Sequence, residues 1–335
     1  MPEPDDSVLT PAALQAPIPA APPRPAGSIR RTSHVDMIPG PDGLELRGAA
    51  RDLVTGPDGA TTTVDRSALR AVVGATGVVT ALDVEPARAE TATLVGRPAQ
   101  SGFRAAVRAA LPGEVAAGTP LAVLLDDIPV ATLISGYARM YDEDRPPPDP
   151  AALAVRENVC SGWRADGVMM ASVRSGGRIS VTLGPEVPDP TVERASDPDG
   201  WHELPDLAPG AMRRRRRLDL WPAGDHLEIR AFFRDTHRAR SGRESVLHEY
   251  DLSATVDADS GRFSRCDAVP RVLPWVECPV AAASSDQLVG RRPAEVQELV
   301  GRELRGTRTC THLNDLLRSL AAVDTLANVI APRPT

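Results

Sequence analysis

The sequence predicts an α+β protein made of two tandem copies of one module. Each module is expected to be an antiparallel four-stranded meander followed by helices packed on one face of the sheet. Two observations lead to this prediction. One is an internal repeat, and the other is the order of hydrophobic periods in each copy, where alternating segments precede helical ones. A run of strands followed by a run of helices is typical of α+β folds.

The repeat needs no gap over its clearest part. Residues 30–52 align with residues 213–235 at ten identical positions out of 23, whereas chance would give roughly two or three. The identical pairs are Arg30/Arg213, Arg31/Arg214, Asp36/Asp219, Pro39/Pro222, Asp42/Asp225, Leu44/Leu227, Glu45/Glu228, Arg47/Arg230, Arg51/Arg234 and Asp52/Asp235. Further along, Leu94-Val-Gly-Arg97 recurs as Leu288-Val-Gly-Arg291. The sequence therefore predicts an internal duplication with small insertions in its loops.

The elements are clearest in the second copy. Leu218–Trp221 and Leu227–Thr236 alternate around the turn-like residues Pro222-Ala-Gly-Asp225, which indicates a hairpin. A third strand is expected at Tyr250–Val256 and a fourth at Arg262–Val269. Three helical patterns follow, at Val280–Val289, Ala294–Leu304 and Leu313 to about Ala331.

These patterns divide the chain into four parts. Residues 1–28 are rich in Pro and Ala and are expected to be a disordered tail. The first module is expected at 29–140 and the second at 211–331. The linker, 141–210, is expected to contain a β-hairpin whose strands, Val168–Val173 and Ile179–Leu183, flank Ser175-Gly-Gly-Arg178.

Charge and composition exclude several classes of function. A net charge of −7 argues against binding to nucleic acid or to an anionic membrane surface. The run Arg213–Arg217 is predicted to be a solvated edge strand that discourages aggregation. The longest apolar run, around Leu121–Ile134, is too short to cross a bilayer, and the N-terminus lacks the apolar stretch of a signal peptide. We therefore expect a soluble, cytoplasmic protein, and the all-arginine basic residues indicate a GC-rich bacterial genome. Its partner is unknown, and a small molecule or another protein would be compatible with this composition.

The candidate site lies at the start of the last predicted helix. Cys310 and His312 precede this helix, Thr311 is placed to cap it, and Asp315 is expected in its first turn. A helix N-terminus favours the thiolate form of a cysteine. Cys278, followed by a proline, precedes another predicted helix.

Three readings of this corner stay open. Cys278, Cys310 and His312 could hold zinc or iron, with Asp267 or solvent completing the ligand set, so the cofactor is undetermined between these metals and none. The same groups could form a Cys/His nucleophile or a persulfide carrier. Alternatively, both cysteines could be small buried hydrophobic residues. The function thus stays open between a metal- or sulfur-handling or small-ligand protein, a thiol-dependent enzyme and a non-catalytic interaction protein.

The remaining cysteines and histidines give weaker signals. Cys266 is expected in the core, and Cys160 is expected to pack rather than to act as a fourth ligand. The other five histidines are isolated and are expected on the surface or in loops, with the motif Asp235-Thr-His237 the one near a strand end: His34, His202, His226, His237 and His248. The first copy has no cysteine, because Gly118 and Pro120 stand where Cys310 and His312 would be.

With Cys278 and Cys310-Thr-His-Leu313, residues 211–331 resemble the bacterial family of domains of unknown function numbered 2889. That family has an arginine-rich opening strand and a terminal Cys-Thr-His-Leu helix. A more distant likeness is to iron–sulfur scaffold and sulfur-acceptor proteins of the NifU and SufE kind, which implies a sheet followed by helices. The Cys-x-His order of Cys310 and His312 differs from the adjacent His-Cys pair of those scaffolds, so the likeness implies the fold rather than cluster assembly.

Overall fold

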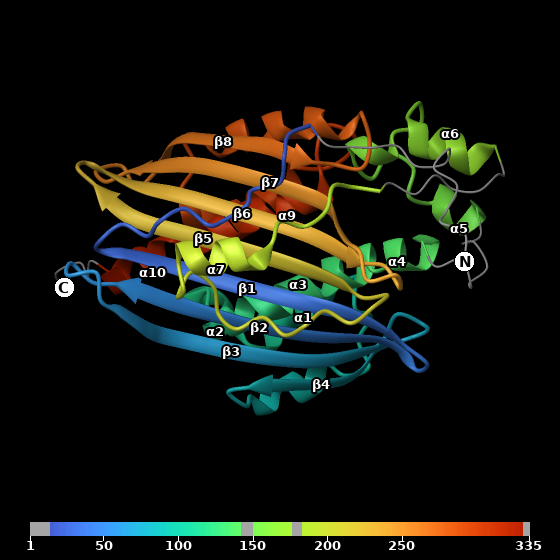
Figure 1. The fold of residues 1–335 in the computed structure, drawn as a ribbon, viewed down its shortest axis with the longest axis horizontal. Helices are drawn as coiled ribbons and strands as arrows, with labels where there is room; N and C mark the ends of the chain where they lie inside the picture. The colour runs from blue at the N-terminus through green and yellow to red at the C-terminus, as the bar shows by residue number, and fades with distance from the viewer. Residues whose placement is uncertain (1–13, 142–149, 176–182, 331–335) are drawn as a thin grey trace.

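The computed structural model describes residues 14–141, 150–175 and 183–330, and over these residues one antiparallel sheet of eight strands forms its centre (Figure 1). The strand order is β4-β3-β2-β1-β5-β6-β7-β8. The strands are β1 (Ser28–Gly40), β2 (Gly43–Thr55), β3 (Thr61–Gly74), β4 (Val79–Glu85), β5 (Met212–Ala223), β6 (His226–Arg238), β7 (Glu244–Asp257) and β8 (Phe263–Val272). The predicted α+β class and antiparallel strands are confirmed, whereas the duplication of a module stays a prediction.

The two meanders join edge to edge at the middle of the sheet. β1 pairs with β5 in antiparallel register, from Ile29 opposite Leu220 to Met37 opposite Met212. The predicted hairpin of the second half is also present, because Gly224, at φ 67°, lets the chain turn between β5 and β6. The predicted modules therefore share one sheet, and their boundaries as separate domains stay a prediction.

Most helices cover one face of this sheet, behind it in Figure 1. The first half supplies a 3-10 helix at Ala89–Leu94, then α1 (Phe103–Ala110), α2 (Pro112–Ala117), α3 (Pro120–Ile134) and α4 (Gly136–Tyr141). The second half supplies 3-10 helices at Cys278–Leu288, Pro293–Glu295 and Leu320–Ala322, and α8 (Val296–Arg302), α9 (Thr311–Ser319) and α10 (Val323–Ile330). Between the halves lie α5 (Pro150–Ala154), a 3-10 helix at Ser161–Trp163, α6 (Val168–Arg174) and α7 (Pro190–Ser196).

A separate hydrophobic cluster lies under each half of the sheet. Under the second half, Leu313, Leu316 and Leu317 of α9 pack against the core-facing residues of β6 and β7. Under the first half, α3 packs on β1, β2 and β3. The helical stretch Pro120–Ala138 is long and apolar enough to cross a membrane by composition alone, but 56% of its most apolar window is buried inside the protein. Such burial is consistent with a core helix of a soluble protein.

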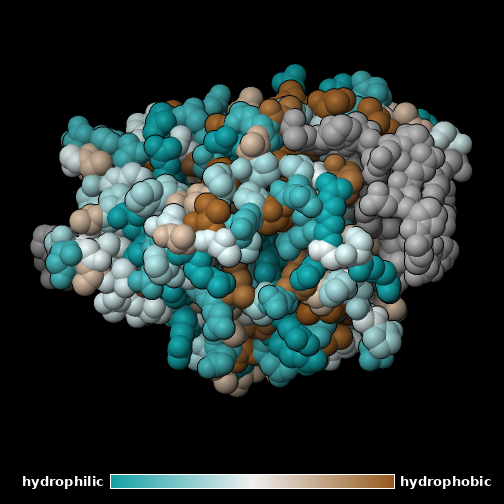
Figure 2. All heavy atoms as spheres, viewed as in Figure 1, coloured by the Kyte–Doolittle hydropathy of each residue, from teal (hydrophilic) through white to brown (hydrophobic). Residues whose placement is uncertain are grey.

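The opposite face of the sheet is covered by α7 and by the strap, the N-terminal residues 14–27 (Figure 1). The strap is ordered by polar contacts: the backbone N–H of Ile18 donates to Glu249, and Arg24 forms a two-fold ion pair with Asp197. The expected disorder therefore does not extend to residues 14–27, and residues 1–13 lie outside the described residues. Figure 2 shows this face as mostly hydrophilic, with apolar residues in small separate groups.

The linker differs from the prediction. Residues 168–173, expected as a strand, form α6, in which Met169, Met170 and Val173 pack into a small cluster of their own. These three apolar residues follow helical rather than alternating spacing, because 169, 170 and 173 share one helix face. The second expected strand, at 179–183, lies almost wholly outside the described residues.

The arginine run is not an edge strand. Arg213–Arg217 lie in β5, at the centre of the sheet, and all five are buried. Five successive arginines show no alternation of polar and apolar residues, so the sequence pattern does not indicate a buried strand. The strand is nevertheless buried, because each guanidinium pairs with a carboxylate or carbonyl on its own face of the sheet. Arg213 pairs with Asp36, Arg215 with Glu193 and Arg217 with Asp219 on one side. On the helix side, Arg214 pairs with Asp235 and Arg216 with Asp127. The run is thus an internal ion-pair layer and presents no basic patch to nucleic acid.

Candidate metal centre

Asp235, His248 and His312 meet between the second half of the sheet and α9. Asp235 in β6 lies directly opposite His248 in β7, so both side chains stand on the helix-covered face. His312 comes from the first turn of α9, which begins at Thr311 with Cys310 as its N-cap residue. The prediction that Thr311 caps this helix is therefore wrong, and Asp315 lies beyond the first turn.

The two imidazoles are stacked, and both point a nitrogen at the same carboxylate oxygen. Their ring centroids are 3.8 Å apart with an interplanar angle of 18°. His248 Nδ1 lies 3.7 Å and His312 Nε2 lies 3.8 Å from Asp235 Oδ2. Both nitrogens are buried without a hydrogen-bond partner among the described residues. A buried polar atom left unpaired costs about 1–3 kcal/mol, so this convergence calls for a ligand or an ordered water.

The surroundings keep both imidazoles neutral. Burial, and then the positive charge of Arg214, lower the pKa of His312 to about 3. Burial and the neighbouring His312 lower the pKa of His248 well below its usual value. Asp235 is fixed by Arg214, which donates to both of its oxygens at 2.7 and 2.8 Å. Neutral imidazoles and an oriented carboxylate are the forms in which these groups bind a cation.

The predicted thiols lie beside this cluster. Cys310 Sγ is 3.7 Å from Nδ1 of His312, and the backbone N–H groups of His312 and Leu313 point at this sulfur. Burial raises the pKa of Cys310 to about 12 and that of Cys278 well above its usual value. The expected thiolate is therefore wrong, because desolvation outweighs the helix N-terminus when the sulfur is this deeply buried.

The linker carries Cys160 into the same corner. The backbone N–H of Ser161 donates to the carbonyl of Thr309 at 2.9 Å, just before α9. The N–H groups of Gly162, Trp163 and Thr311 point at the Cys160 sulfur. Cys160, Cys278 and Cys310 thus interact within one buried region that also contains Tyr250, and burial raises the pKa of this tyrosine. No spacing in the sequence indicated that Cys160 would approach the other two.

Asp267 does not join them. It lies on β8 with its side chain half exposed and pairs with Arg265 at 3.2 Å. Its neighbour Cys266 is buried in the core, as predicted, so Asp267 points to the opposite face of the sheet. Among the described residues, the group of three or more candidate ligands whose ligand atoms all lie within 4.8 Å is Asp235, His248 and His312. Cys278 and Cys310 are not part of that group.

Gly162 allows the linker to close over Cys278, and this gives a first prediction. A Cβ atom at this position would lie 2.8 Å from Cys278 Sγ and 2.9 Å from the Trp275 ring. We expect Gly162→Ala to lower the free energy of unfolding by about 1–3 kcal/mol, as overpacking in a core does. Urea unfolding measures this loss. Gly113→Ala, where a Cβ meets nothing within 4 Å, is the matched control.

His34 and His237 were expected on the surface or in loops and are instead buried in β1 and β6, whereas His202 lies in a loop, as expected. His34 is buried in β1, and its Nδ1 lies 2.7 Å from Nε2 of His202. The other nitrogen of His202 lies 2.8 Å from the hydroxyl of Thr32. Burial, then Arg213 and Arg215, lower the pKa of His34 to about 3, and burial, then His34, lower that of His202 to about 2. This pair lies on the strap side of the sheet and is already hydrogen-bonded.

The His34–His202 pair predicts a loss of stability in acid. Below the ordinary pKa of 6.5 the unfolded chain takes up protons that these folded histidines cannot bind, so stability is present above pH 6.5 and falls on acidification. Between pH 7.5 and pH 5.5 each of these histidines should lower the free energy of unfolding by about 1.3 kcal/mol. Urea unfolding at both pH values measures this loss. From pH 7.5 to pH 5.5 the free energy of unfolding should fall by about 2–3 kcal/mol less in the double variant His34→Gln/His202→Gln than in the wild type. An unchanged drop would contradict the low pKa values.

The sequence held a partial signal for the metal cluster. In the motif Asp235-Thr-His237 the histidine is the expected candidate, but its ring packs against the ring of Tyr137, with 5.6 Å between the ring centroids. Asp235 is the residue of that motif that reaches the cluster. His248 lies two residues before Tyr250, so extending the predicted third strand by one alternating pair would have placed it on the core face.

The fold and this cluster define a mixed α+β protein with a buried Asp/His group, and neither specifies a reaction. Residues 212–325, from the start of β5 into α10, match the family described as Protein of unknown function (DUF2889). This match supports the family resemblance of the second half and includes all three cluster residues. No curated protein and no solved structure matches the chain, so the likeness to NifU and SufE proteins has no support from them.

Proposed function

We propose that the protein binds a divalent transition metal ion, zinc or iron, through Asp235, His248 and His312. The observation that carries the proposal is the convergence of two unpaired imidazole nitrogens on one carboxylate oxygen, at 3.7 and 3.8 Å. Ligand atoms around a tetrahedral zinc ion lie about 3.4 Å apart, so the three atoms would move inward on binding. The two stacked rings would also rotate apart, so that each ring plane contains the metal. Two histidines and one carboxylate leave further coordination positions for water or a small ligand.

The hydrogen bonds beside the cluster suit metal binding. His312 Nδ1 faces the sulfur of Cys310 and the hydroxyl of Thr311, so with the proton on Nδ1 the lone pair of Nε2 faces Asp235. Arg214 holds the carboxylate and is itself held by Asp315 at 3.2 Å. These neighbours orient the ligands in the way that outer partners of metal sites do.

The first half of the chain has the same arginine–aspartate pair as the metal cluster but lacks the histidines, and this difference supports the proposal. Arg31 donates to both oxygens of Asp52, as Arg214 does to Asp235, and Asp65 lies opposite Asp52 where His248 lies opposite Asp235. Across the centre, Arg30 pairs with Asp219 and Arg213 with Asp36 at 2.6 Å each, which are equivalent positions of the repeat. We infer from these matched pairs that the halves arose by duplication, with the histidines in the second half alone.

Metal content tests the proposal. Wild-type protein purified without an affinity tag should bind close to one equivalent of zinc or iron by elemental analysis, and His248→Gln and His312→Gln should each lose most of it. His226→Gln is the matched control, because His226 is a partly exposed histidine with two acidic neighbours and lies outside the cluster. Equal metal content in wild type and both cluster variants, or none in any of them after incubation with Zn²⁺ and Fe²⁺, would overturn the proposal.

The three buried thiols lie near the proposed metal site but are not among its proposed ligands. Cys310 contacts a proposed ligand, whereas Cys278 and Cys160 lie further along the same buried region. Cys278→Ala should therefore leave the metal content unchanged if the Asp/His group is the site. A loss of metal in Cys278→Ala would instead favour a ligand set made of Cys278, Cys310 and His312.

A further inference from the structure

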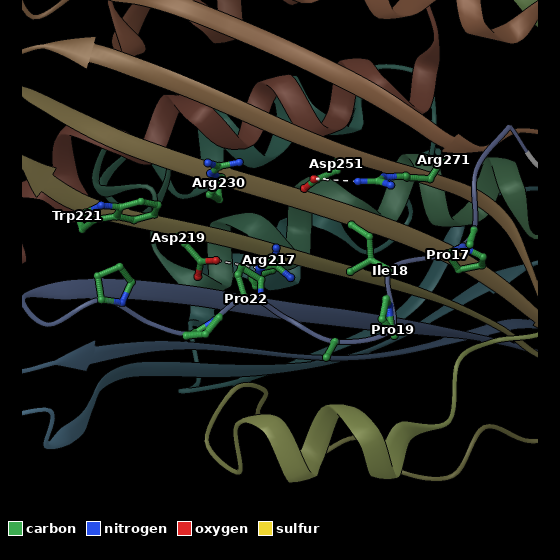
Figure 3. A pocket seen from close by; sticks show the side chains of 14 residues that line it. Pro17, Ile18, Pro19, Pro22, Arg217, Asp219, Trp221, Arg230, Asp251 and Arg271 are labelled. Carbon is green, nitrogen blue, oxygen red and sulfur yellow. Dashed lines mark hydrogen bonds and ion pairs between the residues drawn. The ribbon is translucent and has the colours of Figure 1, made fainter.

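A groove lies on the opposite face of the sheet, between the strap and strands β5 to β8. Its volume is about 690 Å³, within the range of small-molecule sites. Figure 3 shows strap residues Pro17, Ile18, Pro19 and Pro22 along one wall. The sheet supplies the other wall through side chains from its four strands: Arg217, Asp219, Trp221, Arg230, Asp251 and Arg271.

The strap is fixed over this groove by hydrogen bonds at Ile18 and at Pro22. The backbone N–H of Ile18 donates to Glu249, and Arg234 donates to the carbonyl of Ile18. Further along, Arg30 donates to the carbonyl of Pro22 at 2.7 Å. Proline fixes the backbone angle φ, so this wall loses little further entropy when a ligand binds. The groove is therefore preformed.

The groove has an excess of positive charge in a chain whose net charge is −7. Arg271 lies 3.7 Å from Asp251, and Arg217 lies 2.9 Å from Asp219. Asp219 is also held by Arg30 at 2.6 Å. The groove lining therefore holds three arginines, Arg217, Arg230 and Arg271, and two carboxylates.

Arg230 is the unpaired member of the set. It lies directly across from Asp219 in the β5–β6 pair, but that carboxylate is already taken by Arg30 and Arg217. Arg230 makes no hydrogen bond or ion pair with any residue that the structure describes. Trp221, two residues beyond Asp219 on the same face of β5, also lines the groove.

We propose that the groove binds a small organic anion in which a phosphate or carboxylate group is joined to a planar apolar group. Arg230 would bind the anionic group, since a free guanidinium matches such oxygens in a two-fold hydrogen bond. Trp221 and the strap prolines would contact the planar group. This site is on the other face of the sheet from Asp235, His248 and His312, so it does not depend on the metal proposal.

Calorimetric titration of the full chain with phenyl phosphate tests the proposal. Saturable binding is expected, weaker by about tenfold in Arg230→Gln and by a smaller factor in Trp221→Leu. Benzyl alcohol, the neutral analogue, should not bind. Arg66→Gln is the matched control, because Arg66 is an exposed arginine on β3 of the same sheet, and its affinity should equal that of wild type.

Three outcomes would overturn the proposal. One is the absence of saturable binding up to about 10 mM phenyl phosphate. The second is equal affinity in wild type and Arg230→Gln, with both shown to be folded by circular dichroism. The third is that inorganic phosphate binds as tightly as phenyl phosphate and Trp221→Leu binds both unchanged, since charge alone would then explain the binding.

Discussion

Asp315→Ala should destabilise the protein by about 3–5 kcal/mol, because it leaves one buried and two half-buried guanidinium groups without their shared carboxylate. Asp315 lies in α9 with 2% of its surface exposed. Its two oxygens accept from Arg318 at 2.7 Å, Arg104 at 2.8 Å and Arg214 at 3.2 Å. These three arginines belong to α9, α1 and β5, so the carboxylate joins the helices of both halves to the centre of the sheet.

Urea unfolding of the wild type and the variant measures this effect. Glu298→Ala is the control, since Glu298 forms an exposed ion pair with Arg302 one helical turn away and should change stability by no more than about 0.5 kcal/mol. Asp315→Asn keeps the shape and loses the charge, so an intermediate loss is expected. A loss below about 1 kcal/mol in Asp315→Ala would show that solvent compensates these arginines, and the ion pairs of Asp315 would then not hold the helices of the two halves together.

How far the sequence predicts the fold depends on which contacts are local. The β5–β6 hairpin and the β7 and β8 strands follow from alternation and turn residues within a few positions of each other, and all four are present. The joining of β1 to β5 is a contact between residues 175 to 191 positions apart, and nothing in a local pattern specifies it. The reciprocal pairs Arg30–Asp219 and Arg213–Asp36 fix this register, and they are visible only when both halves are placed together.

The candidate site shows the same division. His312 was identified because a helix start is a local signal. The sequence instead places His248 on the surface or in a loop, since the predicted third strand begins two residues too late to include it. Cys278 and Cys310 were correctly placed near helix starts, but their burial depends on the linker segment around Gly162, which folds onto them from more than a hundred residues away. Burial raises the pKa of the Cys310 thiol, so the local sequence, which indicates only the helix start, predicts a thiolate where the folded protein favours the neutral thiol.

Slow alkylation of Cys278 and Cys310 is the second large effect expected. A pKa of about 12, against the ordinary 9.0, leaves the thiolate fraction of Cys310 roughly 1000-fold lower at pH 8. The greater nucleophilicity of a more basic thiolate recovers about 20-fold of this, so reaction with iodoacetamide should be at least about 50-fold slower in the folded protein than in urea. Limited access to sulfurs that are 5% and 3% exposed would add to this factor.

Peptide-resolved mass spectrometry after timed alkylation measures each cysteine separately. Val276→Cys provides the matched control, because Val276 lies two residues before Cys278 and is 73% exposed, so the new thiol should react at close to its unfolded rate. If Cys310 in the folded protein reacts as fast as that control, its thiolate is accessible and the thiol-dependent enzyme becomes the better hypothesis. If it reacts slowly while Val276→Cys reacts fast, nucleophilic or sulfur-carrying chemistry would first require the linker around Gly162 to move away from Cys278. Metal binding by Asp235, His248 and His312 requires no such opening, because the nitrogens and the carboxylate oxygen already face one another.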